Sequence, residues 1–489
     1  MRASAVSCRV ARHDRGERVK APWSTLPEPP IGEGQWFTGR TVTVMGLGQW
    51  GGGLGVVQWL VQLGARVCLT DQAPEAKLME SLRPLAGPIA DGRVRLRLGG
   101  HHRDDFTQAE LVVANAAVPQ PWANEFLKEA ASAGVPVTTE IRLALGHLNA
   151  MRVVGITGSA GKSTTTAMTA LALRASGRHA RIGGNFGGSL LGGARAGPDE
   201  WIVLELSSAQ LWWLSCEAGG RGWSPAIGVL TNIAPNHLDW HGSLTHYSWS
   251  KGQIRRDQGP TEIFLSSFAD EHPSGAAMVD ADGHGDAWWA RPSTLSEATP
   301  EPPPLSVPGE HQRRNARLAL AILGACAQLD GAPTDTEAAC AALAAFGGLD
   351  HRLQFVGEFQ GVRCYNDSKA TTPEATLLAI SSLADAHRIH LIAGGYDKKI
   401  DLSPISALAP RLAGLYGIGA TQEEVARHPS ARRCTTLECA VETAMSLAKS
   451  GDLLLLSPGC ASWDQFTNFE ARGKRFVELL RSRAASDHC

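Results

Sequence analysis

The sequence predicts an α/β protein with three domains, each built around a mostly parallel sheet. Short apolar runs alternate with glycine-rich turns and helical segments from Arg40 onwards, a pattern typical of βαβ units. The chain has 489 residues, and because single cores stop growing at about 250–300 residues, several cores are expected. We place the domains at residues 36–148, 149–347 and 348–489. Residues 1–35 show no strand or helix period, and we expect a flexible leader there.

The first domain opens with the strand TVTVM, a glycine turn, the helix LGVVQWLVQLG and the strand ARVCLTD. The turn contains Gly46, Gly48 and Gly51, and Asp71 follows about twenty residues later, which matches the dinucleotide fingerprint of a Rossmann-like domain. The strand LVVANAAVP, the helix WANEFLKEAASAG and the segment VPVTTEIRLAL complete the domain. From these residues alone, NAD is a candidate ligand.

The second domain begins with the strand MRVVGITG, which runs into GSAGKSTTT and the helix AMTALALRASG. This context is typical of a phosphate loop in a P-loop ATPase-like domain with a parallel or mixed sheet. Glycines let backbone N–H groups surround phosphate oxygens, Lys162 reaches the terminal phosphates, and Ser163 can bind Mg²⁺. Ile156 departs from the strict motif, because the glycines fall at 155, 158 and 161. The implied ligand is a nucleoside triphosphate, most simply ATP.

Further candidate residues follow the phosphate loop. WIVLELS and AIGVLTNI are near-continuous apolar runs that predict parallel strands. Glu205 ends the first of them, where a carboxylate is well placed to bind Mg²⁺ beside the loop. His237 follows the second, and Tyr247 and Lys251 share one face of a predicted helix. Residues 280–309 predict a turn-rich surface loop with short strands, and the helical stretches RRNARLALAILGACAQL and TEAACAALAAF close the domain near residue 347.

The third domain alternates strands and helices again and is expected to be Rossmann-like. It carries three motifs: NDSKAT from Asn366, GGYDK from Gly394, and the long LSPGCASWDQFTNFEARG from Leu456. With these motifs and the order of those before them, residues 38 to 480 resemble the Mur ligase family, ATP-dependent amide-forming enzymes of peptidoglycan precursor synthesis. Within the family, the sequence of these motifs is most similar to that of members that add D-glutamate to UDP-N-acetylmuramoyl-L-alanine.

The resemblance implies that ATP phosphorylates the substrate carboxylate and that the amine of the amino acid attacks the acyl phosphate. The implied catalytic residues are Lys162, Glu205, His237, Lys251, Arg352 and Lys369. Those implied for ATP are Gly158, Ser159, Ala160, Gly161, Lys162, Ser163, Thr164, Asn315, Arg352 and Asp367. Those implied for the UDP substrate, in place of NAD, are Gly48, Asp71, Asn185, Ser207 and Gln210, and those for the amino acid are Thr371, Lys398, Ser462 and Phe469. Two Mg²⁺ sites would use Ser163, Glu205, His237 and Lys251, the last carbamylated by CO₂.

Composition restricts the partners. The chain has 46 basic and 48 acidic side chains, so it lacks the basic excess that nucleic-acid binding needs. No apolar run reaches the roughly 18 residues of a membrane span, and the Arg-rich opening has no apolar signal region. We expect a cytoplasmic monomer that binds neither nucleic acid nor membrane, with its ten scattered cysteines reduced.

Four residues differ from those usual in the family motifs: Ala116, Ala160, Ala209 and Gln312. They leave two alternatives open, a ligase with another acceptor such as L-glutamate and a nucleotide-binding protein without turnover. Because the residues that bear charge or bind metal are all present, an active enzyme is favoured.

Overall fold

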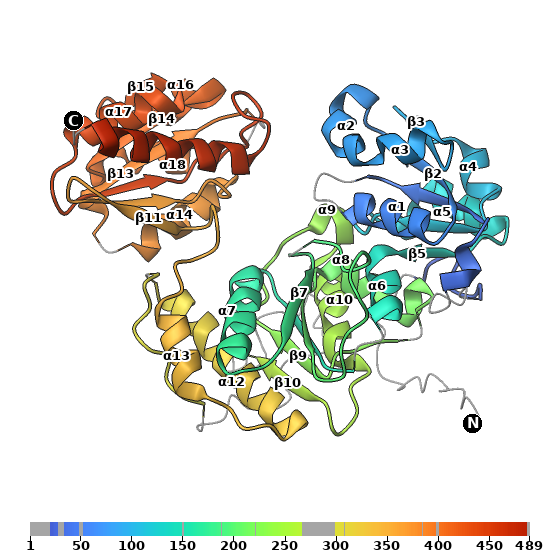
Figure 1. The fold of residues 1–489 in the computed structure, drawn as a ribbon. Helices are drawn as coiled ribbons and strands as arrows, with labels where there is room; N and C mark the ends of the chain where they lie inside the picture. Colours follow the sequence, from blue (N-terminus) through green and yellow to red (C-terminus); the bar gives the residue numbers. More distant parts are fainter. Residues whose placement is uncertain are drawn as a thin grey trace. The chain divides into compact units, whose positions relative to one another are not determined.

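The computed structural model describes residues 20–27, 34–47, 52–148, 151–186, 188–220, 222–266, 299–307, 309–383, 385–397 and 401–486. The chain forms two compact units, unit 1 from Met1–Glu301 with Asn315–Cys340 and unit 2 from Pro302–Arg314 with Ala341–Cys489. Two parallel sheets lie in unit 1 and one mixed sheet lies in unit 2 (Figure 1). The predicted α/β class is confirmed. Among the described helices, none has both the length and the apolar character needed to cross a membrane.

The first sheet is parallel with the order β3-β2-β1-β4-β5. Its strands are β1 Thr41–Met45, β2 Arg66–Asp71, β3 Val94–Leu98, β4 Leu111–Ala114 and β5 Val137–Thr139. Its helices are α1 Gly52–Gln62, α2 Glu75–Leu82, α3 Ala86–Ala90, α4 Arg103–Thr107, α5 Glu125–Ser132 and α6 Glu140–Leu148, with short 3₁₀ helices at Gly34–Phe37, Arg83–Leu85 and Pro121–Ala123. All four residues of β4 are buried, as expected for a strand covered on both faces.

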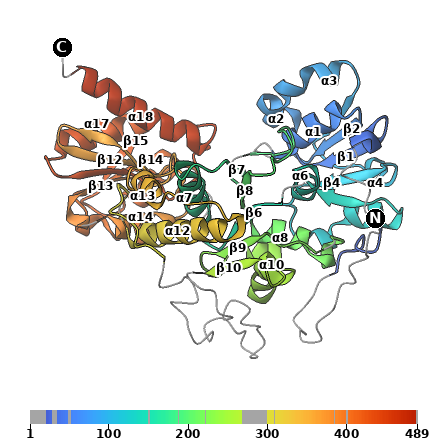
Figure 2. The ribbon, with the colours of Figure 1, turned by 60° about the horizontal axis from the view of Figure 1, so that its bottom comes forward.

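The second sheet is also parallel, with the order β10-β9-β6-β8-β7. Its strands are β6 Val153–Thr157, β7 Ala180–Gly184, β8 Trp201–Glu205, β9 Ile227–Leu230 and β10 Ile263–Ser266. Its helices are α7 Lys162–Ala175, α8 Ser208–Leu214, α9 Leu238–His241 and α10 Leu244–Arg256, with a 3₁₀ turn at Cys216–Ala218. Helices α8 and α10 pack against each other (Figure 2). Since β6 lies between β8 and β9, the segments that follow these three strands emerge at one edge of the sheet.

Two further helices, α12 Glu310–Asp330 and α13 Thr336–Ala344, each begin in one unit and end in the other. They coincide with the two helical stretches predicted to close the second domain. Most of the predicted surface loop at 280–309 lies outside the described residues.

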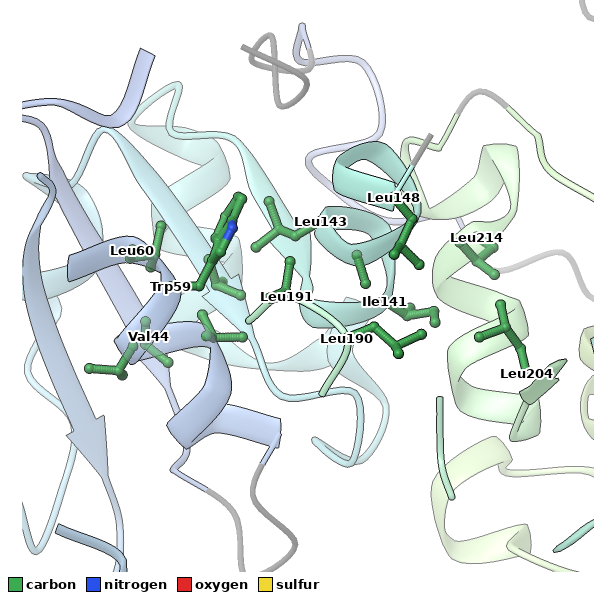
Figure 3. Packing of buried hydrophobic residues seen from close by; sticks show 14 of the residues in the cluster. Val44, Trp59, Leu60, Ile141, Leu143, Leu148, Leu190, Leu191, Leu204 and Leu214 are labelled. Atoms are coloured by element: carbon green, nitrogen blue, oxygen red, sulfur yellow. The ribbon is translucent and has the colours of Figure 1, made fainter. Parts of the chain in front are cut away.

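One hydrophobic core joins the first two sheets. Leu143 and Leu148 of α6 lie between Trp59 of α1 and Leu214 of α8, and Leu190 packs into the same cluster (Figure 3). Burial of this apolar surface holds the two sheets together in unit 1.

Part of the expected leader is packed rather than flexible. Trp23 is 2% exposed, stacks on Trp213 with a centroid distance of 5.3 Å, and donates its indole N–H to the Ala218 carbonyl at 3.0 Å. The Ala21 N–H donates to the Glu217 carbonyl. A single buried tryptophan supplies enough apolar area to fix this segment without any strand or helix period, and the expectation of a flexible leader is therefore wrong for residues 20–27.

The third sheet has six strands in the order β11-β12-β16-β13-β14-β15, parallel except for the antiparallel β11–β12 pair. Its strands are β11 Gln354–Phe359, β12 Val362–Asn366, β13 Ile389–Gly394, β14 Gly414–Ile418, β15 Arg432–Thr435 and β16 Leu453–Leu456. Its helices are α14 Pro373–Ser382, α15 Ser403–Ser406, α16 Gln422–Val425, α17 Leu437–Leu447 and α18 Phe469–Ser486, with 3₁₀ turns at Ala386–Arg388, Ala409–Arg411 and Gly419–Thr421. The central strand β16 is fully buried.

Candidate active site

The phosphate loop connects β6 to α7, and at two of its positions there is no room for any residue larger than glycine. A Cβ at Gly158 would lie 1.9 Å from Thr231 Oγ1, and a Cβ at Gly161 would lie 2.8 Å from Asn315 Oδ1. Gly161 also caps α7 with a left-handed φ of 80°, a conformation that glycine adopts without steric cost. The loop therefore ends at a helix N-terminus, the arrangement that favours anions.

The segment after β9 holds this loop in place. Asn232 accepts the Ala160 N–H at 2.9 Å and donates to the Ala160 carbonyl at 3.2 Å, while Thr231 Oγ1 donates to the same carbonyl at 2.5 Å. The Ser159 N–H donates to the Asn232 carbonyl at 3.0 Å. Two of the loop amides that were expected to face phosphate are thus bonded within the protein. Asn232 was not singled out from the sequence, because its role depends on β6 and β9 being neighbours.

Two lysines meet at the loop. Lys162 Nζ donates to the carbonyls of Gly158 and Ser159 at 2.9 and 3.2 Å. Lys251 Nζ, on α10, donates to the Gly158 carbonyl at 2.8 Å and to Thr157 Oγ1 at 3.3 Å. Lys251 is 1% exposed, and burial, reinforced by the charge of Lys162, holds the pKa of its amine well below the usual range. A neutral amine is therefore accessible at this position.

Tyr247 lies one turn before Lys251 and links α10 to the same loop. Its hydroxyl is 2.7 Å from Ser159 Oγ, and its ring lies 4.7 Å from Lys251 Nζ. Burial raises the pKa of Tyr247 to about 12, so the phenol stays protonated and serves as a hydrogen-bonding group. The predicted common face of Tyr247 and Lys251 is what brings both to the loop.

Glu205 ends β8, and its backbone pairs in register with Ile156 of β6. It is 2% exposed. Its Oε1 accepts from Asn185 Nδ2 at 3.0 Å, whereas its buried Oε2 has no hydrogen-bond partner among the described residues. A buried carboxylate oxygen without a partner is costly unless a cation or a donor meets it. Glu205 therefore fits the expected role of binding Mg²⁺ beside the phosphate loop.

Ser207 and Gln210, two of the expected substrate residues, cap α8. Ser207 Oγ accepts the Gln210 N–H at 3.1 Å, and Gln210 Oε1 accepts the Ser207 N–H at 2.9 Å. This reciprocal capping box fixes the start of the helix that follows Glu205.

His237 lies at the exposed end of the site and caps α9 with a left-handed φ of 51°. Burial and then the charges of Lys162 and Lys251 lower the pKa of His237. The segment that precedes His237 is bonded to the loop, through Asn232 at Ala160 and through the Ala234 N–H at Ser159 Oγ. Within the described residues, however, no three His, Cys, Asp or Glu side chains converge as a metal site. Mg²⁺ is commonly held by one or two carboxylates plus substrate phosphates, so this arrangement agrees with a site that the nucleotide completes.

The remaining ATP residues of unit 1 lie at the start of α7. Ser163 and Thr164 are buried in its first turn. Asn315 of α12 is 7% exposed, and its Oδ1 accepts from Thr165 Oγ1 at 3.3 Å. Asn315 thus lies beside Gly161 of the loop, where a Cβ would lie 2.8 Å from its Oδ1.

Of the expected UDP residues in the first sheet, Gly48 lies outside the described part of the chain. Asp71 ends β2, with its Oδ2 accepting the Leu47 N–H at 2.9 Å and its Oδ1 accepting the Ala73 N–H at 2.8 Å. The carboxylate therefore fixes the turns after β1 and β2 at the carboxyl edge of the sheet, where ligands of such sheets bind.

In unit 2, Asp367 follows β12 and is buried. Its Oδ1 accepts the Leu353 N–H at 3.0 Å, and its Oδ2 accepts the Ser457 hydroxyl at 2.7 Å. Burial raises the pKa of Asp367 to about 6, opposed by these hydrogen bonds and by the charge of Arg352. Because Leu353 directly follows Arg352, its hydrogen bond to Asp367 brings these two predicted nucleotide residues close together.

Two of the expected acceptor residues, Thr371 and Ser462, follow β12 and β16, which are neighbouring strands. Lys369 Nζ lies 5.5 Å from the centre of the Phe469 ring, and Ser462 is 2% exposed. Thr371 lies two residues beyond Lys369 and is half-buried. Lys398 lies outside the described residues.

Arg472 joins these loops and was not singled out from the sequence, although it lies in the long third motif. Its guanidinium donates to the hydroxyl and carbonyl of Ser368 and to the carbonyls of Cys460 and Ala461, at 2.9 to 3.2 Å. Ser368 precedes Lys369, and Ala461 precedes Ser462. Arg472 is 1% exposed. The sequence shows only an arginine near the start of a predicted helix, and it does not show that this arginine is buried.

Family models match the chain in three places. The Mur ligase MurD-like N-terminal domain matches residues 40–139, the Mur ligase middle domain matches 156–279, and the Mur ligase glutamate ligase domain matches 351–460. A relative from Anaeromyxobacter dehalogenans, named UDP-N-acetylmuramoylalanine--D-glutamate ligase, is 35% identical over 91% of this chain and 98% of its own length. The chain belongs to the Mur ligase family.

A second relative of the same name, from Geobacillus kaustophilus, is 34% identical over 91% of this chain and 98% of its own length. Among solved structures, UDP-N-acetylmuramate-alanine ligase MurC from Thermotoga maritima is similar with a TM-score of 0.55 and 18% identity, over 91% of this chain and 100% of that one. That likeness shows the Mur ligase fold. Each family match lies inside one of the three predicted domains, and the middle match contains the phosphate loop, Glu205, His237 and Lys251.

Proposed function

We propose that the chain is an ATP-dependent ligase that joins D-glutamate to UDP-N-acetylmuramoyl-L-alanine in peptidoglycan precursor synthesis. The observation that carries the proposal is the similarity, at 35% identity over 91% of this chain, to a relative named for that reaction. The geometry supports it, because a phosphate loop, a buried carboxylate and a buried lysine meet at one sheet edge.

The reaction has two steps. A carboxylate oxygen of the UDP substrate attacks the γ-phosphorus of ATP, the bond to the β-phosphate oxygen breaks, and ADP leaves. The neutral amine nitrogen of glutamate then attacks the acyl carbon, phosphate leaves with the bonding electrons, and the nitrogen loses a proton as the amide forms. Such transfers depend on positioning and charge neutralisation. In the proposal Lys162 and the α7 N-terminus bind the phosphates. Arg352 and Lys369 are proposed as catalytic residues, and Arg352 and Asp367 as nucleotide-binding residues.

Lys251 is proposed to be a carbamate in the working enzyme. The neutral amine attacks CO₂, a nitrogen–carbon bond forms and a proton is released, which converts the amine into a carboxylate-like ligand. The low pKa of the buried amine supports this step. Ser163, Glu205, His237 and carbamylated Lys251 would then hold two Mg²⁺ ions, which neutralise phosphate charge.

The three predicted domains are proposed to divide the substrates. Residues 36–148, with Gly48 and Asp71, bind the UDP group, and Asn185, Ser207 and Gln210 of residues 149–347 continue that site next to ATP. Residues 348–489 bind the amino acid through Thr371, Lys398, Ser462 and Phe469. The polar and aromatic surroundings of Lys369 at the carboxyl edge of the third sheet support an anionic acceptor there.

The test is product formation with a panel of acceptors. The protein is incubated with ATP, Mg²⁺ and UDP-N-acetylmuramoyl-L-alanine, and ADP and phosphate are measured with D-glutamate, L-glutamate or no amino acid. We expect release only with D-glutamate. Equal rates with and without D-glutamate would overturn the proposal. Faster release with L-glutamate would identify the alternative acceptor, and ATP binding with no release under any condition would identify a nucleotide-binding protein without turnover.

A further inference from the structure

A buried hydrogen-bond chain centred on His241 joins three helices beside the phosphate loop. His241 ends α9 and is 4% exposed. Its Nε2 is 2.8 Å from Ser208 Oγ on α8, and its Nδ1 is 3.0 Å from His246 Nδ1 on α10. Ser250 Oγ, also on α10, lies 3.5 Å from the same Nδ1 and donates to the His246 carbonyl. One imidazole therefore contacts both neighbouring helices.

Each of these helices carries or follows a residue of the proposed metal and nucleotide site. Ser208 begins α8, three residues after Glu205. The backbone N–H of His241 donates to the carbonyl of His237 at 3.0 Å, and the side-chain contacts of His241 anchor the short helix that His237 caps. Ser250 directly precedes Lys251 on α10. The contacts of His241 thus reach the supports of all three site residues.

The surroundings keep this chain uncharged. Burial lowers the pKa of His241 to about 2 and that of His246 to about 4. Tryptophan rings enclose the pair, with Trp240 4.4 Å from the His241 ring and Trp122 4.8 Å from the His246 ring. A neutral imidazole offers one donor and one acceptor. His241 can therefore bridge two helices without burying a charge.

We propose that His241 is a positioning residue of the phosphoryl-transfer site, which holds Glu205, His237 and Lys251 in a fixed mutual arrangement through α8, α9 and α10. The inference rests on the proposed function. Mutation of a group that orients metal-binding side chains typically lowers metal affinity or activity about ten- to a hundred-fold. His241 acts through Ser208 and His246 in this role and is not itself a catalytic residue.

The test compares variants that separate positioning from packing. His241→Phe keeps a buried aromatic ring but removes both nitrogens, and Ser208→Ala removes only the link to α8. The matched control is Trp240→Phe in the same short helix, because the Trp240 indole N–H has no hydrogen-bond partner in the described chain. His241→Gln restores a side chain that can both donate and accept. The thermal unfolding temperature, kcat and KM are measured for each protein. Mn²⁺ binding in the presence of ADP is measured from the electron paramagnetic resonance signal of free Mn²⁺.

We expect His241→Phe to weaken Mn²⁺ binding with ADP by about ten-fold or more and to lower kcat, with the KM for the UDP substrate unchanged. Ser208→Ala should shift the same quantities less, His241→Gln should recover part of the loss, and Trp240→Phe should lower only the unfolding temperature. If His241→Phe does not fold, Ser208→Ala decides the comparison.

The inference would be overturned if His241→Phe bound Mn²⁺ with wild-type affinity, or if Ser208→Ala did so when His241→Phe does not fold. It would also be overturned if Trp240→Phe lost as much Mn²⁺ affinity as His241→Phe. A wild-type protein that forms no product would overturn the proposed ligase activity alone, since Mn²⁺ binding still reads the role of His241. A wild-type protein that does not bind Mn²⁺ with ADP would overturn both.

Discussion

Replacing Arg472 by methionine removes a buried cation whose four hydrogen bonds go to neutral oxygens. Hydrogen bonds from a charged donor contribute about 1.5 kcal/mol each, so the set is worth about 6 kcal/mol. Burial opposes this, because it lowers the pKa of Arg472 from its usual range to about 10, and this shift corresponds to about 3 kcal/mol against the charged form. The net expectation for Arg472→Met is a loss of about 3 kcal/mol in the free energy of unfolding of unit 2.

Hydrogen exchange of peptides from β12 and β16 measures this loss locally, because the loops that Arg472 joins follow those strands. A loss of about 3 kcal/mol lowers their protection by roughly a hundred-fold. Arg481→Met, at an exposed position of the same helix, is the control and should stay within about 0.5 kcal/mol. The kcat/KM for the amino acid should fall in Arg472→Met only. Unchanged protection in Arg472→Met would refute the reasoning, since the four bonds would then give no net stabilisation.

Four other predictions follow from the site. Lys162→Ala should abolish ADP formation, and measurable turnover would remove the lysine from the phosphate site. Lys251→Ala should do the same but regain activity with added short carboxylates, whereas full activity without them would exclude a carbamate role. Asn232→Ala frees the backbone of Ala160 and should weaken ADP binding about ten-fold in calorimetry, since about 1–2 kcal/mol of hydrogen bonding is lost; unchanged affinity would contradict this. The pKa of Asp367 is raised from 3.8 to about 6 in the folded chain, so the folded state binds this proton more tightly and the free energy of unfolding should fall by about 3 kcal/mol as pH rises from about 3 to about 7. Asp367→Asn should flatten that dependence in urea unfolding, and an unaltered slope would refute it.

Two of the strands that the sequence patterns predict are buried on both faces. All residues of β4 and β8, expected from the apolar runs LVVANAAVP and WIVLELS, are buried. The edge strands β3 and β15 were not predicted, because VRLRL alternates arginine with apolar residues and RRCT is mostly exposed. An edge strand forms through hydrogen bonds to a neighbour rather than through its own burial. Its existence therefore depends on which strand lies beside it.

The same division applies to the site. Lys162, Glu205 and Lys251 were predicted because short motifs with fixed spacing place them at the ends of strands or on one helix face. Asn232 and Arg472 were missed, because each acts on backbone groups from a segment far away in the sequence. Hydrogen bonds of this kind need only a donor and an acceptor in reach, and no local pattern specifies them.

The sequence by itself determined the α/β class, the order of the three sheets and the phosphate loop, since these follow from periodicity, glycine turns and local motif chemistry. The tertiary structure alone decided that the first two sheets share one core, that Trp23 packs against α8, and that the neutral ring of His241 joins three helices. Packing places side chains from distant segments within a few ångströms, and burial then sets their charge state. Neither the contact nor the charge state is encoded by the residues taken one segment at a time.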